Sequence, residues 1–155
     1  MSRVYRIESG GLELVVEEIG EGRPLVFAHG LTGNRAGVFE QLEGLTDRFR
    51  IVSFDQRGHG DSSPVLNPEM YDPHLMADDM RAVMDALDIE NAVVGGESMG
   101  AATTLLFALA NPERVESLLL TAPAFGEGPN ADREHIWEMG DCIEKLGVDR
   151  YIADA

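Results

Sequence analysis

The residues with the clearest chemical potential lie in segment 96–100, whose sequence is Gly-Glu-Ser-Met-Gly. A short apolar run typical of a strand precedes this segment, and a helical pattern follows it. Ser98 in this setting is typical of a nucleophile on a sharp strand-to-helix turn, because Gly96 and Gly100 let strand and helix approach closely while Oγ projects outward. The turn also places the Met99 N–H at a helix N-terminus, which favours negative charge. The pattern therefore predicts a nucleophile, Ser98, beside an anion-binding amide.

A second segment, 28–33, can present another backbone donor to the same place. Its sequence, Ala-His-Gly-Leu-Thr-Gly, continues an apolar run, and the Leu31 N–H is the expected donor. Two preorganised donors at a developing alkoxide form an oxyanion hole, in which each is worth roughly 2.7 to 4 kcal/mol. We therefore expect Met99 and Leu31 to bind the oxyanion through their amides. Substrate is expected to contact Gly30, Leu31, Glu97 and Met99.

Two further features near these segments are interpreted as structural. His29 precedes the glycine turn, and no second histidine or acid stands at a ligand-like spacing from it, so a structural role is favoured over catalysis or metal binding. Segment 55–62 follows another apolar run and has the sequence Asp-Gln-Arg-Gly-His-Gly-Asp-Ser. Asp55 and Arg57 can tie this loop together through charged hydrogen bonds, which is favoured over an acid/base role.

The elements that must position these segments follow from apolar patterning. Short apolar runs alternate with helical patterns from residue 24 onward, and two earlier β-prone runs flank Ser-Gly-Gly and predict a hairpin. The hairpin runs are 4–8 and 12–18, the expected strands are 24–28, 50–54, 92–95 and 115–121, and the expected helices are 38–45, 72–87 and 99–110. The alternation predicts an α/β fold with an N-terminal β-hairpin and a mainly parallel sheet covered by helices on both faces. Ligand sites are expected beyond the carboxyl ends of its strands.

Composition restricts the classes of function. The chain of 155 residues has 28 acidic and 12 basic side chains and a formal net charge of −16, which repels nucleic acid and anionic membrane surfaces. Cys142 is the only cysteine, so no internal disulfide can form. The first residues lack the apolar region of a signal peptide, and the longest weakly polar stretch, 101–110, is too short to span a bilayer. We expect a cytoplasmic protein with a small-molecule substrate, no nucleic-acid or membrane partner, no metal site and, without a dinucleotide or Walker glycine pattern, no cofactor.

The three loop segments, in this order and at these places between elements, resemble the α/β-hydrolase family, especially its esterase-like and lactonase-like members. The resemblance covers nearly the whole chain, but the pattern of the chain does not include the family's C-terminal strands. It implies that Ser98 attacks an acyl carbonyl, that the Met99 and Leu31 amides hold the oxyanion, and that the acyl-enzyme is then hydrolysed. Because the nucleophile position holds serine and not aspartate, the family's epoxide hydrolases and haloalkane dehalogenases are poorer matches.

The chain departs from that family where the base and the orienting acid should be. The family's chain order is serine, then an acid, then a histidine, on loops after later strands. His135 is the only histidine after Ser98, and it falls in an expected helix at 132–146 instead of after a last strand. Glu127 is a conceivable orienting acid, whereas His59 and His74 precede the nucleophile. The resemblance therefore implies that the base and the acid lie outside this chain.

Residues 1–122 are accordingly interpreted as the N-terminal part of a hydrolase core, and residues 123–155 as the start of a lid segment. Three functions stay open. The first is a serine hydrolase acting on an ester or related acyl substrate. The second is a non-catalytic fragment that binds ligands or partners through the inherited fold. The third is transfer of the acyl group to another acceptor, such as an alcohol or a peroxide.

The 115–121 strand is expected to form an open edge of the sheet, because no later strand follows it in the pattern. An apolar open edge is a template for pairing with another chain. We therefore predict that the 155-residue chain self-associates or pairs with a complementing fragment. A stable, soluble monomer in light scattering at micromolar concentration would contradict this prediction.

Overall fold

The computed structural model describes residues 2–123 together with 138, 141, 144 and 145. Its contacts divide the chain into two compact units, Met1–Ala124 and Phe125–Ala155. In the second unit the four described residues are helical, and Lys145 Nζ lies 3.2 Å from the Asp141 carboxylate. The rest of the expected 132–146 helix and the lid interpretation lie outside the described residues, as do Glu127, His135 and Cys142.

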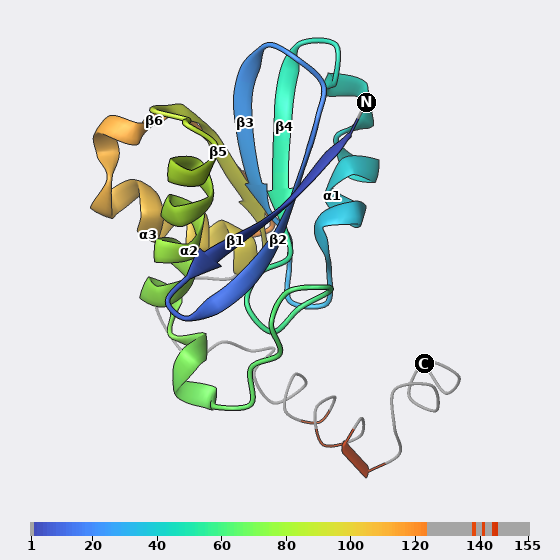
Figure 1. The fold of residues 1–155 in the computed structure, drawn as a ribbon, viewed down its shortest axis with the longest axis vertical. Coiled ribbons are helices and arrows are strands. Elements are labelled where there is room, and N and C mark those ends of the chain that lie inside the picture. Colours follow the sequence, from blue (N-terminus) through green and yellow to red (C-terminus); the bar gives the residue numbers. More distant parts are fainter. Residues whose placement is uncertain (1, 124–137, 139–140, 142–143, 146–155) are drawn as a thin grey trace. The chain divides into compact units, whose positions relative to one another are not determined.

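One six-stranded sheet organises the first unit, with the strand order β1-β2-β4-β3-β5-β6 (Figure 1). The strands are β1 (Arg3–Ser9), β2 (Leu12–Ile19), β3 (Arg23–Ala28), β4 (Phe49–Phe54), β5 (Ala92–Glu97) and β6 (Val115–Thr121). β1 and β2 form the predicted antiparallel hairpin, and β2 also runs antiparallel to β4. β4, β3, β5 and β6 are mutually parallel, which confirms the predicted fold class.

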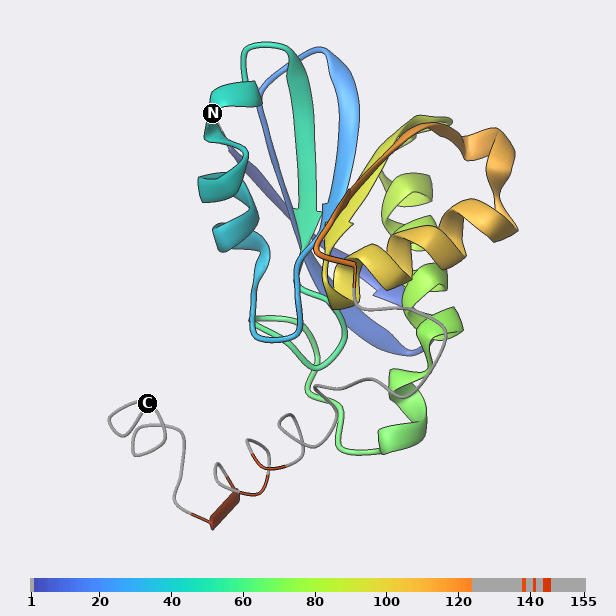
Figure 2. The same ribbon diagram turned by 180° about the vertical axis from the view of Figure 1, so that it is seen from behind.

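Helices cover both faces of this sheet, as expected. The α-helices are α1 (Arg35–Gln41), α2 (Pro73–Ala86) and α3 (Met99–Ala110), and 3-10 turns lie at Glu43–Leu45, Pro68–Tyr71 and Pro112–Arg114. α1 lies on one face, and α2 packs beside α3 on the other (Figures 1 and 2). The expected 38–45 helix begins earlier and ends at Gln41, because the chain tightens into the 3-10 turn that contains Gly44, a poor helix former. No helix in the described part of the chain is long and apolar enough to cross a membrane.

Alternating strand residues supply the cores on the two faces. Toward α2 and α3, strand residues such as Val26 and Phe54 pack with Met80 and Phe107, and all four are fully buried. The intervening strand residues, including Phe27, are buried on the face that α1 covers. Burial on both faces explains why the parallel strands show continuous apolar runs.

β6 lies at one edge of the sheet. It pairs with β5, and no further strand among residues 2–123 pairs with its other side. Leu118 is 45% and Leu119 is 36% exposed, although parallel strands are usually buried on both faces. The edge therefore has the exposed apolar character predicted from the sequence, and the predicted self-association stays a prediction.

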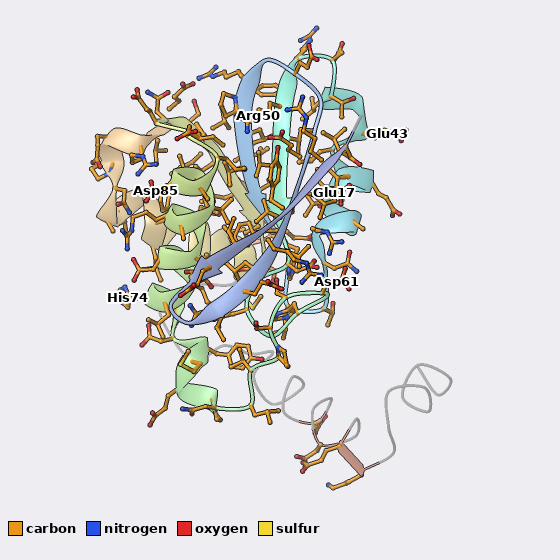
Figure 3. All side chains as sticks on the ribbon, viewed as in Figure 1. Glu17, Glu43, Arg50, Asp61, His74 and Asp85 are labelled. Carbon is orange, nitrogen blue, oxygen red and sulfur yellow. The ribbon has the colours of Figure 1, made fainter. Side chains whose placement is uncertain are left out.

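Charged side chains lie mostly on the outside of the first unit, and Figure 3 shows Glu43, Asp61 and Asp85 projecting from its surface. Arg57 and Asp79 are among the exceptions, since their side chains are 2% and 1% exposed. Arg57 Nε donates to Asp79 Oδ2 at 2.7 Å, and the Ser9 hydroxyl donates to Asp79 Oδ1 at 2.6 Å. This ion pair fastens the 55–62 loop to α2 and to the end of β1.

Replacing Asp79 by asparagine is expected to lower the free energy of unfolding by about 3 to 5 kcal/mol, because the Arg57 charge then stays buried without a counter-charge. The matched control is Asp78→Asn, whose exposed pair with Arg81 on the same helix is worth about 1 kcal/mol at most. Urea unfolding of the three proteins measures the difference. Equal losses in the two variants would contradict a special role for the buried pair.

Candidate active site

Ser98 lies on a strained turn between β5 and α3. Its backbone has φ +50° and ψ −111°, a left-handed conformation that a residue with a side chain rarely adopts. The Ser98 N–H donates to the Thr121 carbonyl at 3.0 Å, and the Ser98 carbonyl accepts from Ala101 N at 3.1 Å and Ala102 N at 3.2 Å. Strain of this kind costs of order 1 to 3 kcal/mol and collects at functional sites. The turn therefore has the backbone of the predicted nucleophile turn.

Close contacts explain why glycines flank this serine. A Cβ on Gly100 would lie 2.1 Å from the Ala28 carbonyl oxygen, and a Cβ on Gly96 would lie 2.3 Å from the Gly100 carbonyl. No side chain fits at either position without moving the backbone. β3, β5 and α3 can thus meet at this one turn. Gly30, two residues after the end of β3, is also close: a Cβ built on it would be 3.6 Å from Ser98 Cβ.

Segment 29–33, here called the oxyanion loop, forms a tight turn beside Ser98. The Gly30 carbonyl accepts from the Gly33 N–H at 3.0 Å and from His29 Nδ1 at 2.7 Å. In a planar trans peptide the C=O and the following N–H point in opposite directions. Fixing the Gly30 carbonyl therefore fixes the direction of the Leu31 N–H, the predicted second oxyanion donor.

His29 has the structural role expected from the sequence. The residue is 2% exposed, and its Nε2 accepts from the Gln56 N–H at 3.0 Å, so Nδ1 carries the hydrogen that is donated to Gly30. Gln56 Nε2 in turn donates to the His29 carbonyl at 2.6 Å, and the Thr103 hydroxyl donates to Gln56 Oε1 at 3.3 Å. Burial lowers the pKa of His29 below its ordinary value, although the hydrogen bond to Gly30 works in the opposite direction. The neutral ring therefore links the oxyanion loop to the 55–62 loop and to α3.

The expected bracing of the 55–62 loop is confirmed, with partners that the sequence did not identify. The Asp55 carboxylate is fully buried and accepts from the Arg35 N–H at 2.8 Å and the Asp61 N–H at 2.9 Å, and it pairs with the Arg35 guanidinium. Asp55 and Arg57 therefore brace the loop toward α1 and α2 and not through each other.

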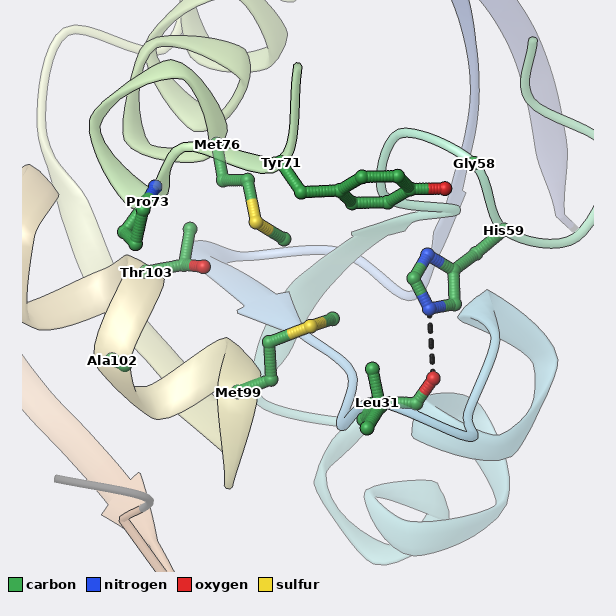
Figure 4. Close-up of a pocket in the computed structure, with 9 residues that line it drawn as sticks. All are labelled: Leu31, Gly58, His59, Tyr71, Pro73, Met76, Met99, Ala102 and Thr103. Atoms are coloured by element: carbon green, nitrogen blue, oxygen red, sulfur yellow. Dashed lines mark hydrogen bonds between the residues drawn. The ribbon is translucent and has the colours of Figure 1, made fainter. Parts of the chain in front are cut away.

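A cavity of about 460 Å³ lies next to the nucleophile turn (Figure 4). The predicted site residues Leu31 and Met99 both lie on its wall. The other lining residues are Gly58, His59, Tyr71, Pro73, Met76, Ala102 and Thr103. Figure 4 shows the Met76 and Met99 thioethers pointing into this space. The wall is therefore mainly apolar where it adjoins the two predicted oxyanion donors.

Some of these residues were not found from the sequence. Tyr71 ends the 3-10 turn Pro68–Tyr71, and Pro73 and Met76 lie at the start of α2, whose helical pattern gave no sign that its N-terminal end reaches the cavity. Glu97, a predicted substrate contact, accepts from Gln41 Nε2 at 2.9 Å and is not among the lining residues. Its contact with substrate stays a prediction.

Within residues 2–123 no histidine nitrogen hydrogen-bonds Ser98 Oγ. Both ring nitrogens of His29 and both of His59 contact backbone groups instead, and His74 is exposed at the start of α2. This part of the chain thus brings the predicted nucleophile, a helix N-terminus and the oxyanion loop together, without a histidine on the serine.

Acid is expected to destabilise the fold through His29. Because its folded pKa is lowered, the unfolded chain binds a proton at a pH where the folded chain does not, so stability is complete above about pH 6.5 and falls below it, by at most about 1.4 kcal/mol per pH unit. Urea unfolding of the wild type and of His29→Gln at several pH values above and below about 6.5 measures how the free energy of unfolding changes with pH. The variant should lose this dependence, and an unchanged slope would contradict the assignment.

The family model described as alpha/beta hydrolase fold matches residues 23–145. The AB hydrolase superfamily protein YisY of Bacillus subtilis (strain 168) is 39% identical over 145 residues, which cover 88% of this chain and 53% of the relative. An epoxide hydrolase of Caballeronia sordidicola is 30% identical over 138 residues, which cover 88% of this chain and 42% of the relative.

Among solved structures, Est816, described as an N-acyl homoserine lactone degrading enzyme, aligns with a TM-score of 0.75 and 28% identity over 92% of this chain and 52% of its own. The chain spans about half the length of the relatives that it matches. The nucleophile turn, the oxyanion loop and the matched family model agree, and the chain belongs to the α/β-hydrolase family.

Proposed function

We propose that this chain carries the nucleophile and the oxyanion hole of a serine hydrolase that acts on an ester or related acyl substrate. The observation that carries the proposal is the strained Ser98 at the N-terminus of α3, so close to Gly30 of the oxyanion loop that a Cβ built there would be 3.6 Å from Ser98 Cβ. Strain persists only where the surroundings over-determine it. Here the strained serine directly precedes Met99, which lines the cavity together with Leu31.

In the proposed reaction Ser98 Oγ attacks the carbonyl carbon of the substrate, and a tetrahedral oxyanion forms. The Met99 N–H lies at the first position of α3, where the helix supplies no acceptor for it, and α3 has no acidic side chain in its first turn. This amide and the Leu31 N–H receive the oxyanion. Collapse of the intermediate releases the alcohol and leaves an acyl group on Ser98, which water then removes. The base and its orienting acid come from outside residues 2–123.

The chemistry of the nucleophile favours acyl substrates over epoxides. One relative of this chain is named an epoxide hydrolase. The family resemblance implies that epoxide hydrolases open the epoxide with a carboxylate nucleophile. The nucleophile position of this chain holds serine instead. A structural relative is described as degrading a lactone, which is a cyclic ester. The apolar cavity wall of Leu31, Met76 and Met99 further favours an uncharged, apolar acyl or alcohol group.

A non-catalytic role is the second candidate, because no histidine among the residues that the structure describes contacts Ser98 Oγ. Such a chain would bind a small acyl compound in the cavity without turning it over. The two candidates differ in whether Ser98 forms a covalent bond.

Incubating the 155-residue chain with p-nitrophenyl butyrate and a phosphonofluoridate, followed by mass spectrometry, tests the proposal. We expect a single acyl or phosphonyl adduct on the peptide that contains Ser98. Release of p-nitrophenol should be slow, because without a histidine the oxyanion hole and binding alone leave roughly 10³- to 10⁴-fold acceleration over water.

Ser98→Ala should abolish the adduct, whereas Ser117→Ala should retain it, because Ser117 is an exposed serine on β6. An adduct that survives Ser98→Ala, or no adduct with either reagent, would overturn the proposal. Binding of the ester without an adduct would support the non-catalytic role.

A further inference from the structure

His59 reaches from the 55–62 loop to the oxyanion loop. Its Nε2 lies 2.7 Å from the Leu31 carbonyl oxygen, and its Nδ1 lies 3.0 Å from the Arg57 carbonyl oxygen. The ring also meets His29 edge-on, with the ring centroids 5.1 Å apart and the planes at 61°. Figure 4 shows the ring on the cavity wall and its contact with Leu31. None of the acyl-transfer steps above uses this side chain.

The Leu31 N–H lies in the peptide plane before the Leu31 Cα, and the conformation of the loop as a whole also depends on the plane after that Cα. The plane before it is held through the Gly30 carbonyl by His29 and Gly33. The plane after it contains the Leu31 carbonyl, whose hydrogen-bond contact in the described part of the chain is His59 Nε2. Packing does little to hold this residue, because Leu31 is 39% exposed. Hydrogen bonds to both carbonyls therefore have to fix its backbone angles.

We propose that His59 is a positioning residue, which donates its Nε2–H to the Leu31 carbonyl and so holds the oxyanion loop in the conformation that aims the Leu31 N–H at the reacting oxygen. The functional part of this inference rests on the proposed function. The structural part, a hydrogen bond that orders the loop, stands without it.

The hydrogen on the ring decides between two arrangements. A neutral imidazole donates from one nitrogen only. With the hydrogen on Nε2 the ring holds the Leu31 carbonyl, at the shorter of the two contacts. With the hydrogen on Nδ1 it donates to Arg57 instead, and His59 would then order its own loop and leave Leu31 without a donor.

Imidazole ¹⁵N chemical shifts of the 155-residue chain distinguish the arrangements without any assay of activity. In a neutral ring only one of the two nitrogens carries the hydrogen, and the two nitrogens then have distinct shifts. We expect a protonated Nε2 in His59. A protonated Nδ1 would overturn the proposal.

Amide hydrogen exchange tests the ordering of the loop. The Gly33 N–H is bonded across the turn to Gly30, so its exchange rate reports the opening of the oxyanion loop. His59→Phe keeps a ring but removes the donor, and it should speed this exchange roughly 2- to 10-fold, the change expected for loss of one neutral hydrogen bond. His59→Gln retains an N–H near the Nε2 position and should restore most of the protection.

The matched control is His74→Gln, because His74 is exposed and lies away from the oxyanion loop (Figure 3). It should exchange like the wild type. Unchanged exchange at Gly33 in His59→Phe, or equal effects of the phenylalanine and glutamine variants, would overturn the ordering role.

The rate of adduct formation on Ser98 tests the functional part. His59→Phe should slow the maximal rate about tenfold, less than the roughly 10²- to 10³-fold cost of losing an oxyanion donor, with little change in the reagent concentration for half-maximal rate. His59→Gln should recover most of it. An unaltered rate in His59→Phe, together with faster loop exchange, would overturn the positioning role alone. Absence of any adduct in the wild type would instead overturn the proposed function, while the exchange and ¹⁵N results would still decide whether His59 orders the loop.

Discussion

The rest of the site depends on a single backbone contact, where α3 touches the end of β3. Gly100 lies so close to the Ala28 carbonyl that an added Cβ would be 2.1 Å from its oxygen, and Gly96 packs against Gly100 in the same way. This contact forces the chain to reverse within one residue, and Ser98 takes the left-handed conformation that results. It also brings the end of β3, and hence the oxyanion loop, against the nucleophile. The positions of the candidate nucleophile and of the candidate second donor thus have the same geometric cause.

The loops around this contact are held by hydrogen bonds more than by apolar packing. Among the residues that the structure describes, every buried side-chain nitrogen or oxygen has a hydrogen-bond partner. His29 and Gln56 exchange two hydrogen bonds that join the oxyanion loop to the 55–62 loop, and Asp79 forms an ion pair with the guanidinium of Arg57. Such fully satisfied networks rigidify a site, since any displaced member would leave a buried polar group unpaired. In a chain with a net charge of −16, Arg35 and Arg57 each form an ion pair with a buried carboxylate, that of Asp55 and of Asp79 respectively.

These networks hold the candidate nucleophile and the candidate oxyanion donors in place. The candidate nucleophile and the candidate oxyanion donors come from loops between β3 and α3, which lie within residues 23–145, the range that the family model matches. The rigid backbone donors do not require a base in order to be positioned. This separation explains how residues 2–123 can have a formed oxyanion loop and a strained serine while no histidine in that range contacts the serine.

The sequence by itself determined the fold class, the hairpin, the nucleophile turn and the structural role of His29, because apolar periodicity and glycine spacing are local properties that reflect burial and sterics. It did not determine which residues meet across loops. The Arg57–Asp79 pair, the Asp55–Arg35 pair and the contact of His59 with Leu31 join residues that lie far apart in the chain. Their partners depend on the order of the parallel strands, which places consecutive loops side by side, and only the tertiary structure decided that order.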